Sequence, residues 1–152
     1  MQEKPRILVS ACLLGMNCRY DGGGKLLPEI EELMRVAELI PVCPEIYGGL
    51  PTPRTPSERV GTRVLMKTGE DVTEAYHRGA QEALALAQRF AVRCAILKER
   101  SPSCGSGEIY DGSFSGAKTA GDGVTAELLK ENGIAVYGES RVRELIEQLK
   151  EG

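Results

Sequence analysis

The stretch "RILVS" (Arg6–Ser10) decides the fold of this chain, because it is short and apolar and leads into the glycine-rich loop "GMNCRYDGGG" (15–24). This pattern is typical of a buried strand that ends in a loop. Similar runs follow at "LIPVC" (39–43), "CAILK" (94–98) and "IAVYG" (134–138). The proline in "LIPVC" favours a sheet edge or an irregularity for that strand. The sequence therefore predicts four strands of one sheet.

Helical patterns separate these strands. The segment "PEIEELMRVAEL" (28–39) has proline at the first helical position, and its apolar residues share one helical face: Ile30, Leu33, Met34 and Ala37. The longest pattern begins near residue 71 or 73 and ends around residue 92. Two more follow, "GVTAELLKENG" (123–133), closed by a glycine typical of a helix C-terminus, and "SRVRELIEQLK" (140–150), with serine as N-cap.

Strands that alternate with helices predict parallel crossovers and a doubly wound sheet. We therefore expect an α/β fold: a single Rossmann-like domain over residues 1–152, with a mainly parallel sheet flanked by helices. Three segments stand outside this alternation: a proline-rich structured loop (44–58), a short strand "TRVLM" (62–66) and a hairpin-like "GEIYDGSFSG" (107–116). The length of the loop suggests that it is functional.

Composition narrows the classes of function. The formal net charge of -3 argues against a dedicated binder of large nucleic acids, whose affinity comes from clustered Lys and Arg. No apolar run is long enough for a membrane helix, and the N-terminus "MQEKPRILVSA" is too short and too charged for a signal peptide. We expect a cytoplasmic protein without membrane partners. There, five cysteines indicate a metal or catalytic role rather than a disulfide framework.

Three cysteines fall at the predicted carboxyl ends of strands: Cys12, Cys43 and Cys104. Ligands of doubly wound sheets bind outside this edge, so the three thiols are expected to converge although they lie far apart in sequence. Cys94 begins an apolar strand and is expected in the core. For Cys18, three roles stay open: a fourth ligand, a resolving thiol, or a residue packed under its loop.

A closed zinc site usually has four ligands in close CxxC pairs, and no such pair occurs here. Single cysteines on separate loops suit an iron–sulfur cluster better, with thiolates on three irons. The fourth iron would then be an open Lewis acid that can bind a substrate sulfur atom. A thiol–disulfide enzyme could use the same cysteines, so the spacing by itself leaves both interpretations open.

Polar residues accompany these cysteines. Glu45 follows Cys43 in "CPE", where it is either a surface carboxylate or a general acid or base. Ser101 and Ser103 flank Cys104, and either they merely turn the chain or a hydroxyl holds a substrate or orients a water molecule.

Three arginines come from the same loops: Arg19, Arg54 and Arg100. Each is either an ion-pair partner or part of a grip on a polar or anionic ligand. The turn "DGGG" (21–24) resembles an anion-binding turn, but no phosphate-loop or dinucleotide motif is complete. The sequence has a single histidine, His77, which excludes a histidine-rich metal site, and this residue is expected to be solvated on the long helix.

Several strings together resemble the thiouracil desulfidase family, long catalogued as a domain of unknown function: "VSACLLG", "NCRYDG", "PVCPE", "GGLPTPR", "LKERSPSCG", "YDG" and "GDGVTAELL". The resemblance spans nearly the whole chain. It implies a Rossmann-like α/β domain that binds a [4Fe-4S] cluster through three cysteines with one open iron. By motif, the ligands are Cys12, Cys43 and Cys104.

The family resemblance also implies the reaction. The open iron captures the sulfur of a 2-thiouracil-type base, and hydrolysis of the thiocarbonyl gives uracil and sulfide. By motif, Glu45 is the acid–base residue and Ser101 the hydroxyl at the substrate. Because the chain is acidic, a small thiolated nucleobase or nucleoside is favoured over thiolated tRNA.

Two other interpretations are ranked below the desulfidase. In a thiol–disulfide redox protein, Cys12 and either Cys43 or Cys18 would exchange a disulfide without iron. A cluster-binding protein without chemistry would hold iron and be indifferent to Glu45→Ala.

Overall fold

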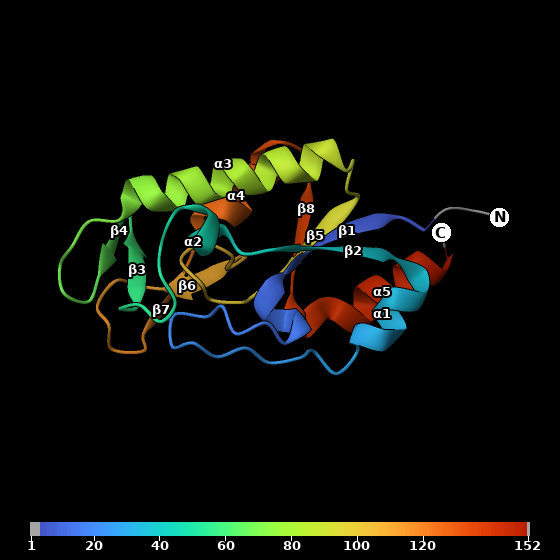
Figure 1. Ribbon diagram of the computed structural model, residues 1–152, viewed down its shortest axis with the longest axis horizontal. Helices are drawn as coiled ribbons and strands as arrows, with labels where there is room; N and C mark the ends of the chain where they lie inside the picture. Colours follow the sequence, from blue (N-terminus) through green and yellow to red (C-terminus); the bar gives the residue numbers. More distant parts are fainter. Residues whose placement is uncertain (1–3, 152) are drawn as a thin grey trace.

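The computed structural model describes residues 4–151, which form an α/β fold around a parallel sheet (Figure 1). The strand order is β2-β1-β5-β8, and all neighbouring pairs are parallel. The strands are β1 (Arg6–Ser10), β2 (Glu38–Val42), β5 (Cys94–Leu97) and β8 (Ala135–Gly138). These are the four strands that the sequence predicts. The proline of β2, Pro41, lies on an edge strand, as expected.

The side chains of each strand alternate between two apolar cores. Ile7 and Val9 of β1 pack on one face of the sheet, and Leu8 packs on the other; all three are fully buried. Because both faces are covered, the central strands are continuously apolar, which is why they are recognisable in the sequence.

Helices cover both faces of the sheet (Figure 1). One face carries α1 (Ile30–Val36) and α5 (Val142–Glu151), and the other carries α3 (Thr73–Arg89) and α4 (Val124–Glu131). The first helix is shorter than residues 28–39, and Met34 is 55% exposed rather than buried. This two-turn helix buries only Ile30 and Leu33, so that Met34 falls at the margin of its apolar stripe.

The last helix also begins differently from the prediction. A 3₁₀ turn, η2 (Glu139–Arg141), precedes α5, and Ser140 lies inside that turn instead of capping the helix. Its hydroxyl bonds the carboxylate of Glu99. A carboxylate acceptor makes a stronger hydrogen bond than a neutral partner, which accounts for this choice of partner.

Two hairpins stand beyond the carboxyl ends of the parallel strands (Figure 1). They pair β3 (Ser57–Val60) with β4 (Arg63–Met66) and β6 (Glu108–Tyr110) with β7 (Lys118–Ala120). The sequence predicts β4 and the second hairpin but not β3, whose first two residues it places in the proline-rich loop. Glu58 of β3 joins the hairpins, because its buried carboxylate accepts backbone N–H groups of Gly112 (2.8 Å) and Phe114 (3.1 Å).

Candidate functional site

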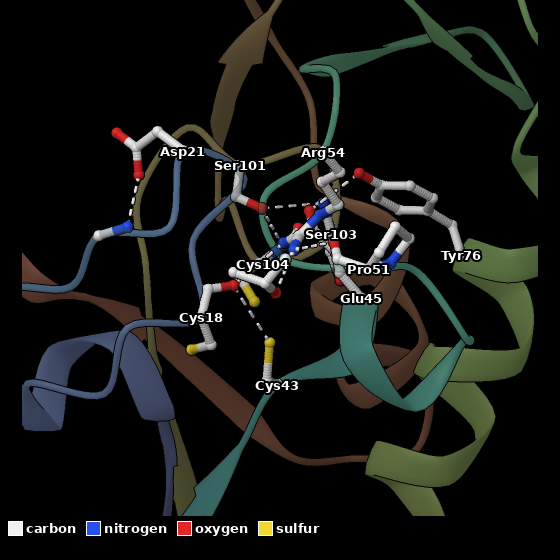
Figure 2. A network of polar contacts seen from close by, with 12 residues as sticks. Cys18, Asp21, Cys43, Glu45, Pro51, Arg54, Tyr76, Ser101, Ser103 and Cys104 are labelled. Atoms are coloured by element: carbon white, nitrogen blue, oxygen red, sulfur yellow. Dashed lines mark hydrogen bonds and ion pairs between the residues drawn. The ribbon is translucent and has the colours of Figure 1, made fainter.

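Three strand ends deliver cysteines to one cavity of about 130 Å³. Cys12 lies in η1 (Ala11–Leu14), directly after β1. Cys43 follows β2, and Cys104 lies in the loop after β5. Cys18 lines the same cavity, and Figure 2 shows the sulfur atoms of Cys18, Cys43 and Cys104 gathered in one view. The structure thus brings together the three cysteines that the sequence places at the sheet edge and adds a fourth.

The loop that carries Cys104 is docked on the N-terminus of α4. Backbone N–H groups of Val124 and Thr125 donate to the carbonyl oxygens of Pro102 and Ser103, both at 2.8 Å. These helix N–H groups have no partner within their own helix, so the loop satisfies them. The docking fixes the position of the Cys104 thiol at the cavity wall.

Ser101 shapes the turn before Cys104. Its hydroxyl oxygen accepts the backbone N–H groups of Ser103 and Cys104, both at 3.1 Å, and its side chain lines the cavity. Since both bonds use the oxygen, the hydroxyl hydrogen is left to donate elsewhere. Ser103 is 1% exposed and shares a 2.8 Å hydrogen bond with Thr125, and it is not among the residues that line the cavity.

Glu45 stands at the centre of a polar network on the cavity wall (Figure 2). It lies in the first turn of the short helix α2 (Pro44–Tyr47), two residues after Cys43. Arg54 forms an ion pair with its Oε2, and the Tyr76 hydroxyl donates to its Oε1 at 2.9 Å. The carboxylate is therefore bound on both oxygens and held at the wall of the cavity that the cysteines line.

Two glycines allow this arrangement, because they let α2 approach α3 closely. A Cβ at Gly48 would stand 2.0 Å from the carbonyl oxygen of Ala75, and one at Gly79 would stand 1.9 Å from that of Pro44. Any larger residue at either position would push the helices apart. The contact between the helices brings Glu45 within reach of Tyr76.

The three predicted arginines lie in different settings. The Arg54 side chain is 3% exposed and lines the cavity, and within residues 4–151 its Nε has no hydrogen-bond partner. Arg19 also lines the cavity. Arg100 does not; it pairs with Glu108 at 3.3 Å and lines a neighbouring cavity. The buried, unpaired Nε of Arg54 suits a cavity whose occupant offers a hydrogen-bond acceptor.

Burial keeps the thiols of Cys12, Cys18 and Cys104 protonated near neutral pH. It raises the pKa of Cys12 to about 11 and that of Cys18 to about 12, with the neighbouring Cys43 as the next cause in both. Burial also raises the pKa of Cys104, and a hydrogen bond with the Ser10 hydroxyl offsets part of this rise. Because metals bind thiolates, loading this site must release protons.

Several lining residues were not identified from the sequence: Ser10, Tyr20, Lys98 and Tyr110. Ser10 carries the clearest signal, since it is the polar residue that ends a buried apolar strand at the carboxyl edge. Tyr76 carries none, because it lies on the buried face of an ordinary amphipathic helix.

The number and chemistry of the donors limit the kind of metal centre that the cavity can hold. Across residues 4–151, no three His, Cys, Asp or Glu side chains are close enough to hold a single metal ion. A cluster binds each thiolate at a different iron, so its ligands stand further apart than those of one ion. Three soft thiols spread around one cavity therefore fit an iron–sulfur cluster better than a lone cation.

A second cavity of about 300 Å³ adjoins the first. Both are lined by Glu45, Tyr20, Pro102 and Tyr110. The second cavity adds aromatic and charged groups, among them Phe114, Lys67 and Arg100. Glu45 thus stands at the junction between a thiol-lined space and a wider one.

Other predicted residues lie away from both cavities. Cys94 is 4% exposed in the core, and His77 is exposed on α3. Over the described range 4–151, no helix combines the length and the apolarity needed to cross a bilayer.

Comparison with known proteins agrees with this geometry. A family model described as 2-thiouracil desulfurase matches residues 7–141. YbbK of Bacillus subtilis (strain 168), an uncharacterized protein, is 43% identical over 150 residues, covering 92% of this chain and 99% of that protein. A solved structure of TudS (DUF523Vcz), a [4Fe-4S]-dependent thiouracil desulfidase, is 46% identical with a TM-score of 0.89, covering 98% of this chain and 100% of that one.

Proposed function

Because the chain belongs to the 2-thiouracil desulfurase family, we propose that it is a [4Fe-4S]-dependent desulfidase acting on 2-thiouracil or a related small thiolated nucleobase or nucleoside. From 2-thiouracil the products are uracil and sulfide. Cys12, Cys43 and Cys104 hold the cluster and leave one iron open. The observation that carries the proposal is that these thiols and the Glu45 carboxylate line one cavity.

When bound, the cluster supplies a Lewis acid that polarises the C–S bond of the substrate. Glu45 takes the proton of the attacking water at a free lone pair of its carboxylate. Arg54 forms an ion pair with that carboxylate and holds its Oε2 in place. The hydroxyl of Ser101 uses its free hydrogen to bind the substrate ring, since its oxygen is already occupied. No net electron transfer is required.

The arginines have separate roles in this proposal. Arg54, with its unpaired Nε, donates to the occupant of the first cavity, and Arg19 lies on the same wall. Arg100 faces the second cavity, which has room for the ribose of a nucleoside. Ser103 is assigned no substrate contact, because its hydroxyl is bonded to Thr125.

We further propose that residues 1–152 act as one domain in the cytoplasm and need no large nucleic acid or membrane partner. All five cysteines are free thiols, which suits a reducing compartment. The thiol–disulfide and cluster-carrier interpretations rank lower, because neither uses the bound Glu45 carboxylate.

The test is anaerobic reconstitution with iron and sulfide, followed by measurement of sulfide release from 2-thiouracil. We expect about four irons per chain and catalytic release. The Glu45→Gln variant should keep its iron and lose turnover, whereas Glu31→Gln, on an exposed face of α1, should keep both. An iron-loaded protein that releases no sulfide would contradict the proposal, and so would a fully active Glu45→Gln variant.

A further inference from the structure

Tyr76 is a buried polar residue that the proposed reaction does not use. It lies in the first turns of α3, and 2% of it is exposed. Its ring packs in an apolar cluster with Val64, Val72, Ala80 and Val124. If this side chain only filled space, phenylalanine would be sufficient, because a buried hydroxyl costs free energy unless it has a hydrogen-bond partner.

The partner of this hydroxyl is the carboxylate of Glu45. The Tyr76 hydroxyl donates to Oε1 at 2.9 Å, while Arg54 binds Oε2 (Figure 2). Each carboxylate oxygen can accept more than one hydrogen bond. These contacts therefore fix the orientation of the carboxylate and leave lone pairs free to accept further hydrogen bonds. The side chain is clamped from α3 on one side and from the proline-rich loop on the other.

We propose that Tyr76 is a positioning residue for the desulfidase reaction: its hydroxyl holds Glu45 in the orientation in which the carboxylate lines the thiol cavity. This inference rests on the proposed role of Glu45 as acid–base residue. The contact comes from two elements that close glycine packing locks together, so it belongs to the rigid part of the fold.

The protonation state of Tyr76 agrees with this role. Burial, and after it the charge of Glu45, raises the pKa of Tyr76 far above its ordinary value. The hydroxyl therefore stays a donor at every pH at which the protein would be assayed. Without it, Oε1 loses its donor and the carboxylate can turn about its side-chain bonds.

The kinetic test is Tyr76→Phe, which keeps the ring and removes the hydroxyl. We expect kcat for sulfide release from 2-thiouracil to fall between about tenfold and a hundredfold, with KM within about twofold and iron content unchanged. In a Glu45→Gln background the same substitution should not lower the residual rate of sulfide release any further, because both act through one group. Tyr137→Phe is the matched control, since that hydroxyl bonds Gln148 on an exposed surface.

A second measurement does not depend on activity. In the cluster-free protein, the losses of Tm caused by Tyr76→Phe and Glu45→Ala should not add in the double variant, because either substitution by itself removes the hydrogen bond. Unchanged kcat in Tyr76→Phe, an equal further loss in the Glu45→Gln background, or additive Tm losses would each overturn the inference. Wild-type protein that releases no sulfide would instead overturn the proposed function, and the Tm cycle would then decide whether Tyr76 holds Glu45.

Discussion

Arg54 and Glu45 form an ion pair that is nearly closed to solvent, with 3% and 15% of their side chains exposed. The same guanidinium donates to the carbonyl oxygen of Cys18 at 3.2 Å. One side chain thus joins the proline-rich loop, the helix turn after Cys43 and the loop after β1. Charges in such a setting are stable only while both partners are present.

Replacing Arg54 by methionine should therefore destabilise the cluster-free protein by about 3–5 kcal/mol, because it leaves the Glu45 carboxylate buried without its cation. Urea denaturation followed by circular dichroism measures the loss. Arg63→Met is the control, since the Arg63–Asp71 pair is exposed to solvent, and it should change stability little. Equal effects of the two substitutions would show that the Arg54 pair is not effectively buried.

Substitutions of the individual cysteines should differ in their effect on the iron content of the protein. Cys104→Ala should lose the cluster and its colour, because one ligand is missing, whereas Cys94→Ala removes a thiol from the core strand β5 and should keep the iron. Cys18→Ser should also keep the iron if three thiols are the ligands. Iron analysis after identical anaerobic reconstitution compares the variants, and a fully loaded Cys104→Ala protein would refute the ligand assignment.

Loss of the cluster should allow a disulfide between Cys18 and Cys43. Their thiols are neighbours, and the sulfur of Cys43 lies 3.9 Å from the Cys18 carbonyl oxygen. Treatment of cluster-free protein with hydrogen peroxide should oxidise both thiols to one disulfide while the peroxide is reduced to two water molecules. Peptide mapping without reductant identifies the bond. Cys94 should stay reduced, and a bond from Cys43 to any other cysteine would contradict the prediction.

Cys94 should also contribute to alkaline unfolding. Burial raises its pKa from 9.0 to about 11, so the folded state holds the proton more tightly than the unfolded chain. Its contribution is fully present below pH 9 and is lost as pH rises through 11, a change of roughly 3 kcal/mol. In cluster-free protein, Cys94→Ala should therefore lose stability less steeply than wild type across this interval. Parallel curves of unfolding free energy against pH would rule this out.

The amino-acid sequence was sufficient to predict the alternation of strands and helices. Strands buried on both faces are continuously apolar, and helices repeat their apolar residues along one face, so both signals are local. Local order also placed Cys12, Cys43 and Cys104 at strand ends, which parallel pairing brings to one edge. The sequence did not predict β3 or the true start of the last helix, because each depends on a partner far along the chain, such as Glu99 for Ser140.

The surroundings of Glu45 were decided only by the tertiary structure. Neither the ion pair with Arg54 nor the hydrogen bond from Tyr76 has a local signature. The ion pair forms only when the proline-rich loop folds back on α2, and the hydrogen bond forms only when α2 packs on α3. The same holds for Ser103, which turns toward Thr125 once its loop docks on α4. Residue types and spacing therefore determined which groups reach the sheet edge. Close packing of backbones through Gly48 and Gly79 determined which of them touch, since that contact is set by shape rather than by any pattern along the chain.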